Sequence, residues 1–554
     1  MWGLNTLLSD GLEALQPITK KKLEKIENLK HKSDYELVDY VYSVVKGLPI
    51  FNEVPSTALY HKKSNEKADE SRRIGNELFI RNFDFVNAVE YYTQAVANAE
   101  LGSESLSLAY SNRSHVLLDQ RYYKECLQDI DRALKCNYTE NLKQKLLLRQ
   151  ERAEELKRYQ KNDSYHDPLP EIKNKNKFIE SSSNSIAIRL DENRGPLIVA
   201  TKDIRIGEVL AVEAPYVSQT DIINKYLHCH ECLELCFNMI ACDNCTEALY
   251  CSENCKEQAY KSYHKYECIL IQYGLNKKTI FLRLSLKSVL EYDRLIEDLS
   301  RNDDIVYQSN RYKEIYQMET YKNSKDPKEL YQNALEPVVF YHYLTTYTDI
   351  LKELNVEHKE RVLKELLLKN YFIVGYNNIC IEKLKQSYIC TSEFEVVGSG
   401  VYSLYTKFQH SCFSNTFLLF YGNKIVVKAL TKIRKGEHVT TSFGITFANS
   451  KKSDRQTRLQ KFYNYTCHCE PCLNDWPMSG FLEKGAPIPK KFMKKVTNLF
   501  ASNRLDRSRV KKLLVEAYAL YENLKITEIP TENYILLRCV ICELFLCFAN
   551  KIID

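Results

Sequence analysis

Residues 229–268 hold eight side chains of the types that bind zinc. Cysteines recur there in pairs separated by two residues and then by three, and the segment closes on a His-x3-Cys pair. Thiolates at the shorter spacing chelate one ion from a tight turn, and ligands at the longer spacing share one helical face. The set is large enough for two closed tetrahedral sites. Its members are Cys229, Cys232, Cys242, Cys245, Cys251, Cys255, His264 and Cys268.

A second cluster has the form Cys467-x-Cys469-x2-Cys472. Three thiolates leave one position of a tetrahedral zinc unfilled, so a fourth ligand must come from elsewhere in the chain. Both segments are too short to hold much hydrophobic core, and we expect metal binding to stabilise their folds. A peptide-binding surface on the first segment is a further hypothesis.

Composition places these clusters in an intracellular protein of several domains. The chain has 554 residues, which exceeds the size of one hydrophobic core, and 27% of them are charged. A net charge of +6 is too small and too dispersed for a sequence-specific nucleic-acid binder. We find no secretory signal and no apolar run of the roughly 20 residues that a membrane span requires.

Nineteen cysteines in a reducing compartment favour metal ligation over disulfides. Eight further cysteines belong to neither cluster and are not expected as the fourth ligand of the second one. They are predicted to be small buried apolar residues. They are Cys126, Cys136, Cys236, Cys380, Cys390, Cys539, Cys542 and Cys547.

Helical elements are expected at the start of the chain. Residues 1–66 have helical character, and residues 67–160 contain two units with small residues at matching spacings. Small residues let antiparallel helices pack closely, and the two units resemble tetratricopeptide (TPR) helix pairs. An ordinary helical hairpin is the alternative. The polar, proline-containing residues 161–182 are predicted to be a linker.

Strand-like sequence occurs in two separated blocks, residues 183–228 and 391–447. The cysteine-dense segment and a largely helical stretch, residues 269–390, lie between them. Residues 479–554 are again expected to be helical. The strands of one domain are therefore split by two insertions.

The combined pattern resembles the SMYD (SET and MYND domain) family of lysine methyltransferases, and the TPR-like helices in front point to its fourth class. The resemblance implies an α+β multidomain protein whose β-rich SET fold is split by a MYND zinc finger and a helical insert. Its implied parts are an N-terminal helical segment 1–66, TPR-like helices 67–160, SET parts 183–228 and 391–447, a MYND finger 229–268, a helical insert 269–390, a post-SET zinc region 448–478 and C-terminal helices 479–554.

The resemblance also assigns ligands for three zinc ions. One MYND ion is expected on Cys229, Cys232, Cys251 and Cys255, and the other on Cys242, Cys245, His264 and Cys268. Residues 409–415 (QHSCFSN) are similar to the NHSCxPN signature, whose cysteine completes the post-SET site. Cys412 is therefore the expected partner of Cys467, Cys469 and Cys472.

Further positions correspond to the family's site for S-adenosyl-L-methionine. The expected cofactor contacts are Arg194, Gly195, Asn377, Gln409, His410 and Tyr465, and the expected catalytic-channel residues are Phe443 and Tyr463. Two departures bear on catalysis. Gln409 replaces the signature Asn, and Phe443, in residues 436–444 (GEHVTTSFG), replaces the family's tyrosine and lacks its hydroxyl. Losing one pre-organised transition-state contact commonly costs ~10²–10³ in rate.

Two functions follow as hypotheses. The first is a protein-lysine methyltransferase acting on histone or non-histone lysines, with a role in transcriptional regulation. The second is a catalytically weak or inactive scaffold that recruits partners through the finger and the helices. The resemblance implies co-repressor, histone deacetylase or chaperone partners, a monomeric state, and residence in the nucleus and cytoplasm, with no membrane contact.

Overall fold

The computed structural model describes most of the chain, and the account below concerns that part alone. In these residues no helix is both long and apolar enough to cross a membrane. The described residues are 19–48, 51, 62–160, 168–192, 195–273, 280–300, 306–386, 392–501, 506–524 and 529–550.

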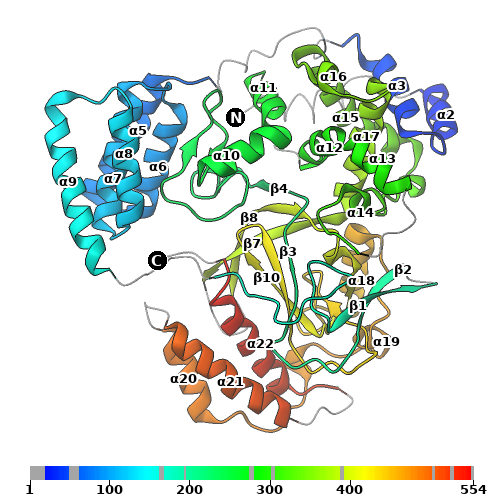
Figure 1. Ribbon diagram of the computed structural model, residues 1–554. Coiled ribbons are helices and arrows are strands. Elements are labelled where there is room, and N and C mark those ends of the chain that lie inside the picture. Colours follow the sequence, from blue (N-terminus) through cyan, green and yellow to red (C-terminus); the bar gives the residue numbers. More distant parts are fainter. Residues whose placement is uncertain are drawn as a thin grey trace.

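Five helices near the N-terminus form a separate array at one side of the molecule (Figure 1). Consecutive helices pack on one another, and polar caps at Ser64, Asp84 and Ser103 start three of them. Gly75 allows one close approach, since a Cβ there would lie 2.8 Å from the Tyr92 ring. We call this set the helical array; it comprises α5 (Asn65–Asn82), α6 (Phe85–Asn98), α7 (Glu104–Asp119), α8 (Tyr123–Lys135) and α9 (Glu140–Tyr159).

Strands from both ends of the middle region join in the same sheets. In one sheet the order is β10 (Thr416–Tyr421), β11 (Lys424–Ala429), β3 (Val209–Glu213), all antiparallel neighbours. In another the order is β4 (Val217–Thr220), β8 (Glu393–Val401), β7 (Asn378–Gln386). Residues before the cysteine-dense segment therefore pair with residues beyond it that lie more than 170 positions further along the chain, as the split pattern predicts.

Two smaller sheets complete the β region. β1 (Ile186–Asp191) and β2 (Gly195–Ala200) form an antiparallel hairpin, and β9 (Gln409–His410) runs parallel to β12 (Thr440–Thr441). The backbone of Val439 donates to Ile198 O at 2.9 Å, which places the hairpin beside the segment leading into β12.

The cysteine-rich module, residues 229–268, is compact and mostly irregular. Its short hairpin, β5 (Ile240–Ala241) and β6 (Leu249–Tyr250), is followed by α10 (Glu253–Ala259). A π-helical turn, Tyr260–His264, then leads into α11 (Lys265–Gln272).

Helices surround the sheets on two sides (Figure 1). Between the strand blocks lie α12 (Ile280–Leu290), α13 (Tyr292–Ser300), α14 (Tyr312–Tyr316), α15 (Pro327–Tyr347), α16 (Ile350–Glu353) and α17 (Lys359–Asn377), against which α2 (Lys20–Leu29) and α3 (Asp34–Val45) pack. After the strands come α18 (Lys452–Tyr463), α19 (Glu470–Leu473), α20 (Lys490–Phe500), α21 (Arg507–Asn523) and α22 (Glu532–Leu546).

Two stretches differ from the expectation. Helix α17 ends at Asn377, and the last part of the predicted helical stretch forms β7, because residues 378–386 pair antiparallel with β8. Residues 168–182, predicted to be linker, have no helix or strand, yet Ile179 is 4% exposed and Ser182 forms a bridge to Ala211 on β3. This half of the segment is packed against the sheet by its few apolar residues.

Candidate functional site

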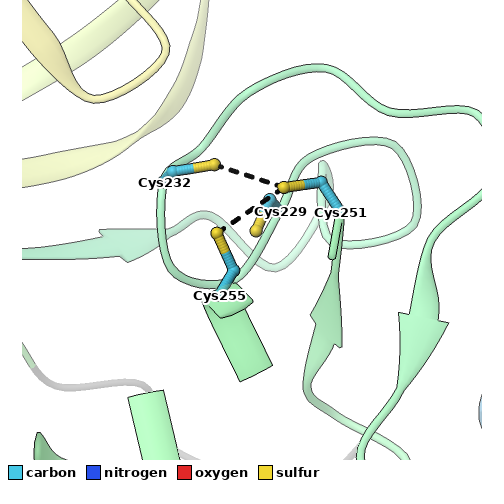
Figure 2. A group of neighbouring side chains, drawn as sticks. All are labelled: Cys229, Cys232, Cys251 and Cys255. Carbon is cyan, nitrogen blue, oxygen red and sulfur yellow. Dashed lines mark hydrogen bonds between the residues drawn. The ribbon is translucent and has the colours of Figure 1, made fainter. Parts of the chain in front are cut away.

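The first sulfur cluster gathers Cys229, Cys232, Cys251 and Cys255, whose ligand atoms all lie within 4.8 Å of one another (Figure 2). Cys232 and Cys251 have their Sγ atoms 3.7 Å apart, and Cys251 and Cys255 have theirs 3.6 Å apart. Two ligands come from the turn before β5. The other two flank the start of α10, which Ser252 caps through the backbone N–H of Cys255.

A second cluster gathers Cys242, Cys245, His264 and Cys268, all buried. The Sγ atoms of Cys242 and Cys268 are 3.8 Å apart, and Cys245 Sγ lies 3.7 Å from His264 Nε2. The interleaved pairing expected from the sequence is thus the grouping found in the structure.

The third cluster joins Cys412 to Cys467, Cys469 and Cys472. Cys412 Sγ lies 3.5 Å from Cys472 Sγ, although 60 residues separate them in the chain. The chain brings Cys412 there on the turn after β9, while the other three follow α18.

These separations fit zinc and exclude disulfides. Tetrahedral zinc with Zn–S bonds near 2.3 Å places sulfur atoms ~3.8 Å apart, whereas disulfide sulfurs are ~2.05 Å apart. Three cysteine-rich clusters compatible with zinc are therefore present. Among the remaining cysteines, Cys126, Cys236 and Cys547 are buried as expected. Cys136, Cys539 and Cys542 are half-buried, Cys380 is exposed, and Cys390 lies outside the described residues.

A fourth group of side chains, all near the third cluster, forms an aromatic-walled site. The Phe443 ring lies between the rings of His410, at 5.1 Å, and Tyr463, at 4.8 Å, measured between centroids. Tyr465 meets the His410 ring edge-on at 6.4 Å. Four of the residues expected at the cofactor and the lysine channel are thus brought together.

Strand pairing holds the centre of this site. The parallel pairing of β9 with β12 sets Gln409 opposite Thr440 and His410 opposite Thr441. Phe443 follows β12 by two residues, and its backbone N–H donates to His410 Nδ1 at 3.1 Å. The ring of His410 is thereby oriented by the segment that carries Phe443.

His410 is neutral in this setting. Burial lowers the pKa of its imidazole to about 4, because an apolar environment disfavours the charged form. Its Nδ1 accepts the Phe443 N–H, so Nε2 carries the proton and lies 3.4 Å from Cys412 Sγ. His410 thus connects the aromatic site to the third sulfur cluster.

Cys380 on β7 also lies near Tyr463. Burial raises the pKa of the Tyr463 hydroxyl, and the nearby Cys380 thiol raises that pKa further. Asn378 lies on the same face of β7 as Cys380, since side chains alternate along a strand. Its buried Oδ1 accepts no hydrogen bond from the described residues, which leaves an acceptor available to a bound ligand.

The other expected cofactor residues that the structure describes lie outside the group of aromatic rings in this site. Asn377 uses its amide to cap α17, donating to Ile373 O at 2.8 Å and to Glu319 O at 3.1 Å. Gly195 has φ of +70° and open space around its Cβ position, which fits a turn that a ligand could approach. Arg194 lies outside the described residues, and Gln409 is half-buried on β9.

Sequence reasoning missed two buried groups beside this site. Tyr405 is 3% exposed, and its hydroxyl lies 3.0 Å from Thr441 Oγ1. Glu213 is 1% exposed and accepts the backbone N–H groups of Leu404 and Tyr405 at 2.8 and 2.9 Å. Glu213 ends a strand of otherwise apolar residues, and that polar interruption is the signal which could have revealed it.

Comparison with known proteins connects these features. No protein-family model matches the chain. The protein-lysine N-methyltransferase SMYD4 of Homo sapiens is 22% identical over 564 residues, covering 78% of this chain and 68% of that protein. SMYD4 of Gallus gallus is 28% identical over 312 residues, covering 42% of this chain and 41% of that protein.

Two further matches are more limited. The N-lysine methyltransferase SMYD2 of Gallus gallus is 23% identical over 287 residues, covering 50% of this chain and 58% of that protein. The crystal structure of the SET domain of LSMT bound to lysine and AdoHcy is 10% identical and covers 66% of this chain and 85% of that one. Its TM-score is 0.25, so this likeness carries no weight here.

Proposed function

We propose that this chain, which belongs to the SMYD family and is similar to the fourth class over most of its length, is an S-adenosyl-L-methionine-dependent protein-lysine methyltransferase. Its substrates would be lysines of histone or non-histone proteins, and its role would be in transcriptional regulation. The observation that carries the proposal is the convergence of His410, Phe443, Tyr463 and Tyr465 from two distant strands and from α18 and the residues just after it.

The chemistry suits an apolar, aromatic-walled site. A lysine attacks only as the neutral amine, and removal from water lowers the pKa of an ammonium group. S-adenosyl-L-methionine, when bound, would supply the methyl group from a sulfonium centre. Phe443 and Tyr463 would form walls that hold the amine in line with that group, and Tyr465 would stack on the adenine.

Several polar groups would hold the cofactor. Arg194, Gly195, Asn377, Gln409 and His410 would contact it. The unpaired Oδ1 of Asn378 adds an acceptor beside Asn377. The three sulfur clusters would hold zinc, which fixes the segments bearing these residues.

Calorimetric titration of S-adenosyl-L-methionine into the full-length, zinc-loaded protein tests this proposal. We expect micromolar binding, and we expect Tyr465→Ala to weaken it at least tenfold. Tyr159→Ala is the matched control, because Tyr159 is 81% exposed on α9 of the helical array. Absence of binding by the folded protein would remove the methyltransferase proposal.

A second candidate function rests on Phe443. Without a hydroxyl at that position, the chain would bind the cofactor but transfer its methyl group poorly or not at all, and would act as a scaffold. The cysteine-rich module and the TPR-like helical array would then recruit proteins such as co-repressors, histone deacetylases or chaperones, as a monomer in the nucleus and cytoplasm. Binding of radiolabelled cofactor without transfer of its methyl group to any protein of a cell extract would favour this candidate.

A further inference from the structure

A buried ionic network lies between the two metal clusters of the cysteine-rich module. At its centre is Glu267, the residue before the ligand Cys268 and only 6% exposed. Glu267 Oε2 lies 2.8 Å from His264 Nδ1 and 3.0 Å from His230 Nε2. Because an ionised carboxylate can only accept, His264 Nδ1 donates to it.

Arg283 completes the network from outside the module. This fully buried side chain on α12 donates from Nε to Glu267 Oε1 at 2.7 Å. Its Nη1 donates to Ser218 O on β4 at 2.7 Å and to His230 O at 3.2 Å. The guanidinium also lies over the Tyr263 ring, 4.5 Å from its centroid. Through His264 and Arg283, the carboxylate therefore connects the second cluster to helix α12 and to β4.

This group is not a further cation site, although His230, His264 and Glu267 offer ligand atoms within 4.8 Å of one another. Arg283 already contacts Glu267 and the His230 ring, and its charge would repel a metal ion. The Nε2 atom of His264 instead faces the thiols, 3.7 Å from Cys245 Sγ.

We infer that Glu267, held in place by Arg283, is a positioning residue for the metal ligand His264. By accepting a hydrogen bond from Nδ1–H, the carboxylate fixes the tautomer of His264 in which the Nε2 lone pair points at the cluster of Cys242, Cys245 and Cys268. It also fixes the ring plane and raises the basicity of the ligand. Partners of this kind typically contribute 10–100-fold to metal affinity.

The position of Arg283 gives the arrangement a second consequence. Since α12 belongs to the helical insert, the ligand geometry of the module depends on a helix that supplies no ligand. Removing either partner of the Arg283–Glu267 pair leaves an uncompensated buried charge. A change at Arg283 therefore disturbs the module, and a change at Glu267 disturbs α12. This inference concerns the metal clusters and does not depend on methyl transfer.

Cobalt substitution of the full-length protein tests it. Of the three sulfur clusters, one contains a histidine nitrogen, so its ligand-field absorption bands differ from those of the all-sulfur clusters. In Glu267→Gln the amide nitrogen would face a donor. We expect its mixed-site bands to shift and chelator-driven metal release from that site to accelerate about 10–100-fold, with the two all-sulfur clusters unchanged.

Glu257→Gln is the matched control, because Glu257 is an exposed carboxylate on α10 that pairs only with Lys261 among the described residues. Its bands and release rates should equal those of the wild type. Unchanged release in folded Glu267→Gln, or equal acceleration at all three clusters, would overturn the inference. Should that variant not fold, Arg283→Lys must show faster release confined to the mixed site, and unchanged release there would overturn the inference instead.

Discussion

Phe443 is the residue on which catalytic strength depends. Its ring contacts those of His410 and Tyr463, yet it offers no hydroxyl to a transferring methyl group. We expect Phe443→Tyr to raise the rate of methyl transfer, by up to about 10²-fold, with little change in cofactor affinity, because one pre-organised polar contact is restored.

The measurement is single-turnover transfer from radiolabelled cofactor to a lysine-rich protein mixture. Phe447→Tyr, which alters a buried ring in the same loop region, serves as the control. A lower rate in Phe443→Tyr would show that the wild-type site obtains its hydroxyl contact elsewhere, for example from Tyr405 or Tyr463.

Glu213 gives the stability of the protein a pH dependence. Burial raises the pKa of its carboxyl to about 7, so the folded chain keeps a proton that the unfolded chain loses near its ordinary pKa of about 4.5. Stability from this group is therefore present below pH 4.5 and is lost as the pH rises through 7.

Glu213→Gln removes this term, since an amide does not titrate while its oxygen still accepts a backbone N–H. We expect the variant to gain on the wild type, by on the order of 2–3 kcal/mol, as the pH rises from 5 to 8. Thermal unfolding at the two pH values measures the difference, and a constant offset would contradict the prediction.

At the scale of elements, the close contact of α5 with α6 depends on Gly75. A methyl group there would lie 2.8 Å from the Tyr92 ring, whose hydroxyl donates to Asn76 Oδ1. We expect Gly75→Ala to destabilise the helical array by about 1–3 kcal/mol, because overpacking forces the ring to move.

Hydrogen exchange of α5 and α6 reports this change. Gly375→Ala is the matched control, since Gly375 is also helical, on α17, and has nothing within 4 Å of its Cβ position. That substitution should be neutral or stabilising by helix propensity. Equal exchange in both variants would show that the array relaxes around the added methyl.

The cysteine-rich module and the helical array are joined by a buried arginine. Arg113 pairs with Asp129 through two hydrogen bonds, at 2.7 and 3.0 Å, and donates to Met239 O of the module at 2.9 Å. Arg132 donates to the neighbouring carbonyl of Asn238 at 2.6 Å. These hydrogen bonds therefore fix the cysteine-rich module to the helical array.

We expect Arg113→Met to cost about 3 kcal/mol or more, because Asp129 loses its main partner, and to increase hydrogen exchange in residues 236–241. Arg81→Met, which removes an arginine with 75% of its side chain exposed, should leave exchange there unchanged. Protection of residues 236–241 as in the wild type would contradict this account of the junction.

Metal content is a property of the whole chain. Elemental analysis of the full-length protein should give three zinc ions per chain, and Cys251→Ser or Cys469→Ser should each leave two. Cys380→Ser should leave three, since this exposed cysteine lies outside the clusters. Loss of more than one ion from a single substitution would show that the clusters do not fill independently.

Local spacing in the sequence identified the paired metal ligands, because thiols two or three positions apart can meet on one turn or one helical face, whereas the grouping of those pairs on each site was implied by the family resemblance. The residue types themselves also showed that the strand-forming residues are split into two blocks and that position 443 has no hydroxyl. The last residues of the predicted helical insert, 378–386, instead form β7, which pairs with the next strand β8, and Ser182 of the predicted linker forms a bridge to Ala211 on β3.

Tertiary structure alone decided the rest. The burial of Tyr405 against Thr441, the bonds of Glu213 with the backbone of Leu404, and the pairing of Glu267 with Arg283 unite residues separated by 16 to 191 positions. Such contacts arise from the packing of whole sheets and helices, in which a buried charge or thiol is stable only where every surrounding element supplies its partner. A linear pattern of residue types does not contain that information.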